Sequence, residues 1–261
     1  MRVTILGCGS SSGVPLLGCD CRVCTASDPR NRRLRASILV ERGPTAVLVD
    51  SSPDLRAQLL SQDVKRLDAV LYTHFHADHV HGIDELRSIN FLMKRPLAAY
   101  GDRDTLARIQ DRFGYIFEPP TPEEGPWYRP RLEPRVIDGP FQVGTLGVTP
   151  FTQLHGAVPD RHPTLGFRFG AFAYSTDVKE LTEESFAALA GVEVWAVDCL
   201  SERPSPAHSH LDQTLDWIRH VQPRRAILTH MSHTLDYASL AARLPPGVEP
   251  AYDGMVVELP D

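Results

Sequence analysis

Long apolar runs and an excess of positive charge are both missing from this chain of 261 residues. No apolar stretch reaches the roughly 20 residues that a membrane-spanning helix needs. The first seven residues, MRVTILG, resemble a first strand and lack the longer apolar core of a secretory signal. The formal net charge is −6, whereas proteins that grip nucleic acid through its phosphates are usually basic. We therefore expect a cytoplasmic protein with no membrane partner, and the charge argues against a nucleic-acid partner.

Internal repeats, low-complexity tracts and linker-like changes of composition are also absent from the sequence. Short, nearly continuous apolar runs such as 3–6 and 69–72 predict strands buried under helices, and helical patterns such as 211–220 lie between them. This pattern predicts an α/β sandwich of two packed sheets flanked by helices, formed by a single domain over residues 1–261. The Pro-rich stretch 118–130 is expected to be a long surface loop near the site.

Cysteine is scarce, with five residues in the chain, and three of them are crowded into the stretch GCDCRVC at Cys19, Cys21 and Cys24. Thiols stay reduced in the cytoplasm, so these cysteines are better candidates for metal ligands than for disulfides. Cys8 and Cys199 lie in apolar strand contexts and are expected to be inert core thiols.

The densest group of histidines follows the predicted strand 69–72 and has the spacing H-x-H-x-D-H, formed by His74, His76, Asp78 and His79. Imidazole suits borderline divalent metals and carboxylate suits harder ones. Four such side chains in one strand-to-helix turn predict a site for one or two metal ions.

Three further candidate ligands stand just after predicted strands: His155, Asp177 and His230. Taken singly, each would more often be a polar loop residue. Taken together, and in this order, they are expected to complete a site for two metals.

The order HxHxDH, His, Asp, His resembles the metallo-β-lactamase superfamily over nearly the whole chain. That resemblance implies an αββα sandwich with two mixed sheets flanked by helices and the metals at one edge of the sheets. It also implies that Asp50, in the stretch LVDSS, orients a ligand histidine. The resemblance implies that one metal is bound by His74, His76 and His155. It implies that the second metal is bound by Asp78, His79 and His230, and that Asp177 bridges the two.

Within that superfamily the cysteine spacing C-x-C-x-x-C resembles the PhnP-type phosphodiesterases, in which a late histidine completes a structural zinc site. The implied fourth ligand here is His233, three residues after His230. Three thiolates and one imidazole make a closed tetrahedral zinc site with no open position for substrate. The N-terminal zinc-binding loop is expected at about residues 18–24.

The same resemblance implies hydrolysis of a small, cyclic phosphodiester by a hydroxide held between two divalent ions, Mn²⁺ or Zn²⁺. Asp78 would serve catalysis as well as metal binding. A histidine is needed to protonate the leaving alkoxide. His208 is favoured because Leu211 follows it at the family's offset, and His210 remains a second candidate, for this role or for substrate binding.

A basic run, PRNRRLRAS, supplies Arg33 and Arg35 as candidates for contacting a second phosphate on the substrate. The partner expected from all this is a small phosphorylated molecule, and the family implies a homodimer. Two alternatives stay open: a tRNA 3′-processing endoribonuclease with the same metal motif, and a non-catalytic metabolite carrier of the same fold.

Overall fold

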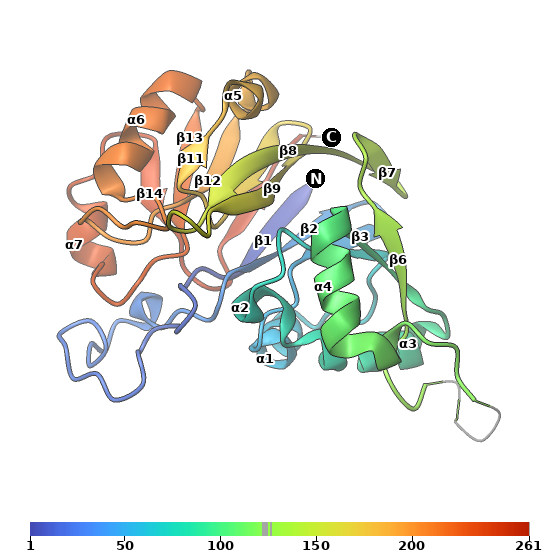
Figure 1. Cartoon of the computed structure of the whole chain (residues 1–261). Coiled ribbons are helices and arrows are strands. Elements are labelled where there is room, and N and C mark those ends of the chain that lie inside the picture. The colour runs from blue at the N-terminus through green and yellow to red at the C-terminus, as the bar shows by residue number, and fades with distance from the viewer. Residues whose placement is uncertain (122–124, 126, 261) are drawn as a thin grey trace.

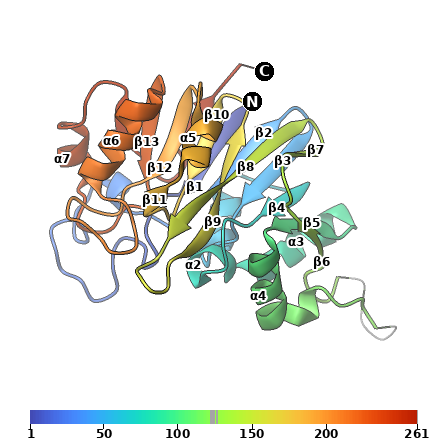
Figure 2. The ribbon, with the colours of Figure 1, turned by 45° about the horizontal axis from the view of Figure 1, so that its top comes forward.

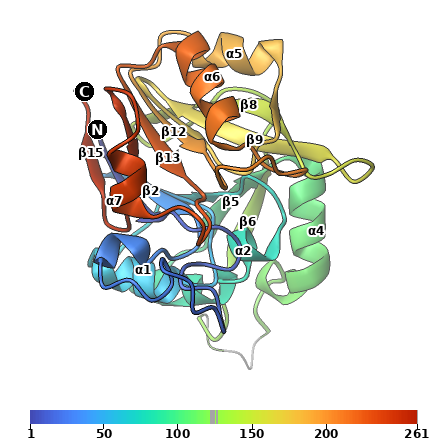
Figure 3. The ribbon, with the colours of Figure 1, turned by 90° about the vertical axis from the view of Figure 1, so that its left-hand side faces the viewer.

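The chain folds as two face-to-face β-sheets with helices on both outer faces (Figure 1). The structure is a computed structural model and describes residues 1–121, 125 and 127–260. The first four α-helices lie on the side of the first sheet, and the last three lie on the side of the second (Figures 1 and 3). The two ends of the chain lie together (Figure 2), where the Met1 amino group donates to the Leu259 carbonyl oxygen at 2.8 Å. This arrangement confirms the predicted sandwich of two mixed sheets.

The strands are β1 (Arg2–Gly7), β2 (Ser37–Arg42), β3 (Thr45–Val49), β4 (Ala69–Leu71), β5 (Leu97–Gly101), β6 (Leu132–Val136), β7 (Phe141–Val143), β8 (Leu146–His155), β9 (His162–Phe169), β10 (Phe172–Ser175), β11 (Glu180–Leu181), β12 (Val194–Asp198), β13 (Arg225–Thr229), β14 (Val248–Pro250) and β15 (Val256–Glu258). The α-helices are α1 (Leu55–Ser61), α2 (Ala77–Val80), α3 (Leu86–Met93), α4 (Arg103–Phe113), α5 (Glu183–Leu189), α6 (Leu211–Val221) and α7 (Tyr237–Ala241), with 3₁₀ turns at Pro29–Asn31, Ile83–Glu85 and Gly114–Ile116.

The order of strands brings the ends of several parallel strands to one edge. In the described residues the first sheet runs β15-β1-β2-β3-β4-β5-β6 and the second runs β11-β8-β9-β10-β12-β13-β14, with β7 paired to β8. Strands β3, β4 and β5 are parallel to one another, as are β10, β12, β13 and β14. Parallel strands present their carboxyl ends at the same edge of a sheet, where α/β proteins place their ligands.

Alternate residues of the first sheet enter two different cores, which explains why its strands are apolar almost throughout. Val47 and Val49 of β3 pack in the core that includes the second sheet, whereas Leu48 packs against the helices that cover the first. Side chains of successive residues point to opposite faces of a strand, so a sheet buried on both faces needs continuous apolar sequence.

Several elements differ from the sequence expectation. Strands β6, β7, β11 and β14 were not predicted; most of the β6 residues are exposed, so they lack the apolar pattern. Helix α1 has Asp54 at its N-cap. The expected Pro-rich loop lies partly outside the described residues, and its described part contacts α3 through Arg87, whose Nε donates to the Trp127 carbonyl oxygen at 3.0 Å.

None of the helices in the described part of the chain combines the length and apolarity that crossing a bilayer requires.

Candidate metal centre and active site

The HxHxDH segment forms the turn between β4 and α2. His76 is the N-cap of α2, and Asp78 and His79 lie in its single turn. His74 and His79 are fully buried, Asp78 is nearly so, and His76 is half-buried. A short helix directly after a buried strand therefore holds four metal-ligating side chains in one compact segment.

The second sheet supplies three more ligand-type side chains from its own edge. His155 is the last residue of β8, Asp177 stands two residues after β10, and His230 follows β13 directly. The parallel register pairs Ser175 with Val197, and Val197 with Leu228, so these strands end at the same level. The predicted ligands thus converge because the sheet aligns strand ends that are far apart in sequence.

The structure groups these side chains into two sets of potential metal ligands, with all ligand atoms of a set within 4.8 Å of one another. One set is His74, His76, His155 and Asp177; the other is Asp78, His79, Asp177 and His230. Asp177 belongs to both sets, as expected of a bridging carboxylate. The grouping has the division of ligands that the resemblance implies.

The nitrogen and oxygen atoms of these side chains are better placed to bind a cation than to hydrogen-bond with one another. The Nε2 atoms of His74, His79 and His230 are buried and form no hydrogen bond with any residue the structure describes. Yet oxygens of Asp177 lie 3.9, 3.0 and 3.3 Å from them. Buried polar atoms are rarely left without a partner. Imidazole nitrogens and carboxylate oxygens that share one space without hydrogen bonding are suited to divalent metals such as Zn²⁺ or Mn²⁺.

In three of the candidate ligand histidines, a hydrogen bond at Nδ1 leaves Nε2 free to bind a metal. Asp50, fully buried after β3, lies 2.7 Å from Nδ1 of His79 and accepts the Thr73 hydroxyl at 2.8 Å. The Thr73 hydroxyl has donated its only proton, so it accepts from Nδ1 of His74 at 3.0 Å. Nδ1 of His155 donates to the Ala207 carbonyl oxygen at 3.0 Å. Such partners fix ring orientation and tautomer in metal sites, so the geometry gives Asp50 its expected role.

The charges of the metal-free site are strongly coupled. Burial lowers the pKa of His74, and it lowers that of His155 to about 4. Burial also opposes charge on His230, but Asp177 and the other nearby carboxylates outweigh it and raise that pKa to about 10. Burial likewise opposes ionisation of Asp177, yet His230 and His79 hold its pKa well below the usual range. Protons on imidazole thus balance the buried carboxylates, and a bound cation would replace them.

Three residues at the site adopt a left-handed backbone conformation, which is uncommon outside glycine. They are Asp50, Asp177 and His230, with φ of 63°, 51° and 55°. Each stands directly or almost directly after a strand of one of the two sheets. Such conformations cost about 1–3 kcal/mol each and cluster at functional sites. The sequence carries no signal for them.

Asp198 is a site residue that the sequence analysis did not single out. It ends β12, is fully buried, and places its two carboxylate oxygens 3.3 Å from Nδ1 of His208 and 3.5 Å from Nδ1 of His230. The backbone N–H and hydroxyl of Ser209 also donate to it. Asp198 lies at the end of a strand, and Asp177 and His230 lie just after strand ends. This shared position could have identified Asp198 as a candidate from the sequence.

The two histidines weighed as general acid differ in position. His208 is half-buried beside the centre, with ring centroids 4.5 Å from His155 and 4.8 Å from His230. His210 is the N-cap residue of α6, and its side chain makes no capping hydrogen bond. The geometry favours His208, the first choice from sequence.

His162 is a second residue near the site that the sequence analysis did not single out. It begins β9, pairs with His155 across the β8–β9 ladder, and lies with its ring centroid 5.0 Å from that of His76. The return strand of a hairpin brings it to the site, a pairing that sequence spacing alone does not reveal.

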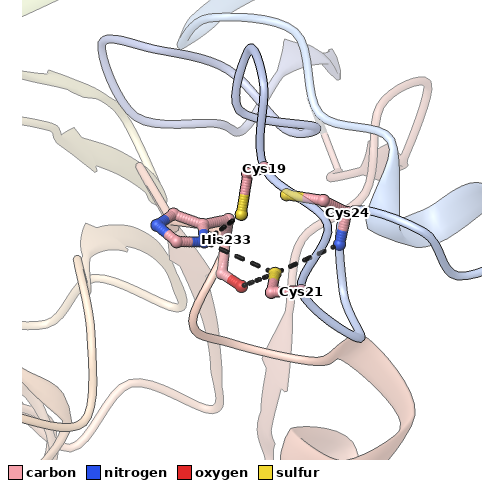
Figure 4. Close-up of side chains that lie close together, drawn as sticks. All are labelled: Cys19, Cys21, Cys24 and His233. Carbon is pink, nitrogen blue, oxygen red and sulfur yellow. Dashed lines mark hydrogen bonds between the residues drawn. The ribbon is translucent and has the colours of Figure 1, made fainter.

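The three clustered cysteines meet His233 as the resemblance implies (Figure 4). Nδ1 of His233 lies 3.7 Å from Sγ of Cys19 and 3.5 Å from Sγ of Cys21. A tetrahedral zinc site with ordinary bond lengths has N and S ligands about 3.6 Å apart. Hydrogen bonding to His233 lowers the pKa of Cys21 to about 6, which favours the thiolate. The donor set and spacing fit one zinc ion held by protein alone.

The prediction that Arg33 contacts substrate is wrong. Its side chain is only 1% exposed, and its guanidinium donates to the carbonyl oxygens of Ser232 and Leu235 at 3.0 and 2.6 Å. It therefore ties the N-terminal segment to the loop that carries His233. Arg35 pairs with Asp54 at 2.9 Å ahead of α1. The sequence pattern does not reveal the partners of either arginine, because these partners lie far along the chain or behind a turn.

Comparison with known proteins agrees with this fold. Residues 45–231 match the family described as the beta-lactamase superfamily domain. The crystal structure of a new diphosphatase from the PhnP family superposes with a TM-score of 0.90 and 32% identity, covering 99% of this chain and 98% of that one. Zn²⁺-bound PqqB from Methylobacterium extorquens superposes with a TM-score of 0.80 at 22% identity, covering 99% of this chain and 100% of that one, which shows a shared fold.

Among sequence relatives, a Porphyromonas gingivalis protein called octanoyltransferase is 37% identical over 98% of this chain but only 51% of its own length. The chain thus spans about half the length of the curated relatives it matches. The matched family, the near-complete overlap with the diphosphatase structure and the convergent His/Asp centre place this chain in the metallo-β-lactamase superfamily, alongside its PhnP family.

Proposed function

We propose that this protein is a metal-dependent hydrolase that cleaves a small, cyclic phosphodiester. The observation that carries the proposal is the pair of ligand sets sharing Asp177, with buried Nε2 atoms that lack any other partner in the described chain. His74, His76 and His155 would hold one divalent ion, Asp78, His79 and His230 would hold the second, and Asp177 would contact both.

Two divalent ions at this position would lower the pKa of water towards neutrality and polarise a phosphoryl oxygen. Their charge exceeds that of the two coordinating carboxylates, so the loaded site attracts an anion. The chain's own residues do the rest of the work: Asp50 and Thr73 hold the imidazoles of His79 and His74 in the ligating orientation. Apart from half-buried His76, the candidate ligands are buried.

Proton delivery to the leaving oxygen falls to His208. Its side chain is 15% exposed, so it meets both the site and solvent, and the Asp198 carboxylate lies 3.3 Å from its Nδ1. A histidine suits general acid catalysis near neutral pH because its pKa lies close to the operating pH. Asp198 also approaches Nδ1 of His230, and it therefore couples the acid to a candidate ligand.

Cleavage of a diphosphate bond is the second candidate, favoured by the diphosphatase that overlaps this chain almost end to end. Both reactions displace an oxygen at phosphorus and would use the same residues. Octanoyl transfer is not proposed, because the chain matches only half of the relative that carries that name. Buried Cys199 and Cys8 have a pKa raised by desolvation, which makes them poor nucleophiles.

The test is a comparison of kcat/KM for the protein loaded with Mn²⁺ or Zn²⁺ on four substrates. They are ribosyl 1,2-cyclic phosphate with and without a 5-phosphate, bis(4-nitrophenyl) phosphate, a dinucleoside diphosphate and precursor tRNA. The proposal expects turnover of the cyclic and aryl diesters, and its loss in Asp177→Ala. Faster cleavage of the diphosphate would favour the second candidate, and cleavage of tRNA the endoribonuclease. Full metal loading without any turnover would refute a catalytic role and favour a carrier.

A further inference from the structure

A pair of cationic side chains lies directly on the segment that carries the candidate metal ligands. Phe75 stands between His74 and His76 and is half-buried. The guanidinium of Arg108 lies 4.3 Å from the centre of the Phe75 ring, and that of Arg112 lies 5.6 Å from it. Nη1 of Arg112 also donates to the Phe75 carbonyl oxygen at 2.6 Å. Both arginines belong to helix α4, which lies near α2 (Figures 1 and 3).

The charge on these arginines is only partly neutralised. Arg108 pairs with Asp104 at 2.8 Å, one turn earlier on α4, where both side chains are more than half exposed. Exposed pairs of this kind are weak and leave the guanidinium available to a stronger anion. The acceptor for Arg112 is a neutral carbonyl, so this contact does not neutralise its charge. Residues four apart share one face of a helix, so both can approach one ligand.

His162 adds a hydrogen-bond acceptor next to Phe75. Its Nδ1 lies 3.0 Å from the Asp160 carbonyl oxygen, which can only accept, so Nδ1 carries the proton. The lone pair of the neutral ring is then on Nε2, a buried atom with no hydrogen-bond partner among the described residues. The ring centroid lies 5.1 Å from Phe75 and 5.0 Å from His76. His162 is in neither ligand set of the centre, and His155 separates it from His208.

We propose that Phe75, Arg108, Arg112 and His162 form a subsite for a second phosphoryl group of the substrate, one that is not hydrolysed. The guanidinium groups match phosphate oxygens in geometry and charge. Nε2 of His162 accepts a hydrogen bond from a hydroxyl next to that phosphate, and the Phe75 ring forms the floor. This subsite takes the role that the sequence analysis gave to Arg33 and Arg35, and it rests on the proposed function.

The experiment compares two substrates that differ only in this phosphate: ribosyl 1,2-cyclic phosphate with and without a 5-phosphate. The readout is the ratio of their kcat/KM values. Arg112→Gln is expected to lower the ratio about 10- to 100-fold, mainly through KM, because a charge-assisted hydrogen bond is lost. The matched control is Arg219→Gln, which removes an exposed helical arginine paired with Asp216 on α6, and it is expected to leave the ratio and the activity unchanged.

A second readout does not depend on turnover. Calorimetric titration with ribose 5-phosphate should give binding that ribose lacks, and Arg112→Gln should weaken it by a similar factor. His162→Phe should weaken ribose 5-phosphate more than inorganic phosphate, because it removes the acceptor for a hydroxyl.

The outcomes separate the subsite from the proposed function. A wild-type protein that cleaves bis(4-nitrophenyl) phosphate but ignores the 5-phosphate overturns the subsite alone. Equal losses on both substrates in Arg112→Gln also overturn it, since they mean that Arg112 only positions the Phe75 backbone. Absence of turnover on every diester refutes the proposed function, and the titration then decides the subsite by itself.

Discussion

Asp50 offers a sharp test of how this centre is assembled. Its carboxylate is fully buried and makes three contacts: with the Thr73 backbone N–H at 2.8 Å, the Thr73 hydroxyl at 2.8 Å and Nδ1 of His79 at 2.7 Å. Asp50→Asn keeps the shape, and asparagine tolerates the left-handed backbone found there, φ 63°. The substitution therefore changes charge and hydrogen bonding with little strain.

The replacement forces His79 into the wrong tautomer or leaves it without a partner. The single side-chain oxygen of the asparagine can still accept from the Thr73 N–H, but its NH₂ group then faces Nδ1 of His79. To accept from it, His79 must move its proton to Nε2, the atom that faces Asp78 and Asp177 and would ligate the metal. Losing such an outer partner typically costs 10- to 100-fold in metal affinity, or about 1.4–2.8 kcal/mol. This agrees with about 1.5–3 kcal/mol for a hydrogen bond to a charged group.

The assay is competition for Zn²⁺ against a chromophoric chelator, with circular dichroism to compare folded fractions. We expect zinc at one of the two proposed active-site metal positions to bind 10- to 100-fold more weakly in Asp50→Asn. The control is Asp68→Asn at the opposite end of β4, where the carboxylate accepts from the Ala46 N–H at 2.9 Å, and it should leave zinc binding unchanged. Affinities within threefold of wild type at both sites, in a folded Asp50→Asn protein, would refute the reasoning.

Three further predictions follow from other contacts. Cys21→Ser should lower zinc content by one ion per chain and lower the melting temperature, because Sγ of Cys21 lies 3.5 Å from His233; unchanged zinc by elemental analysis would contradict the zinc site. Asp198→Asn should lower kcat on ribosyl 1,2-cyclic phosphate about 10- to 100-fold, since its carboxylate lies 3.3 Å from Nδ1 of His208 and positions that side chain; a kcat within threefold of wild type would argue against this role. Gly82→Ala should destabilise the fold by about 1–3 kcal/mol in urea unfolding, because its Cβ would meet the Ser52 carbonyl oxygen at 1.9 Å; wild-type stability would mean that this loop yields freely.

The sequence was most informative where ligands are close together in the chain. The HxHxDH segment carries its own geometry, because a strand followed by one helical turn necessarily brings His74, His76, Asp78 and His79 close together. The same holds for Cys19, Cys21 and Cys24, whose spacing places three thiols in one short loop. The sandwich itself was predictable because strands buried on both faces must be apolar throughout.

Residues separated by long stretches of chain needed the tertiary structure. Asp198 reaches the centre only because β12 lies between β10 and β13 in register, and His162 because β9 returns beside His155. Arg33 looked like a surface charge, yet the loop at 232–235 buries it and accepts its hydrogen bonds. Local spacing thus determined the kinds of ligand and the two groups of neighbouring ligands, the HxHxDH segment and the three cysteines. Strand pairing, burial and the packing of α4 against Phe75 decided which other charged side chains lie near the site. The reason is physical: hydrogen-bonded register and burial are set by contacts distant in sequence, on which short-range patterns carry no information.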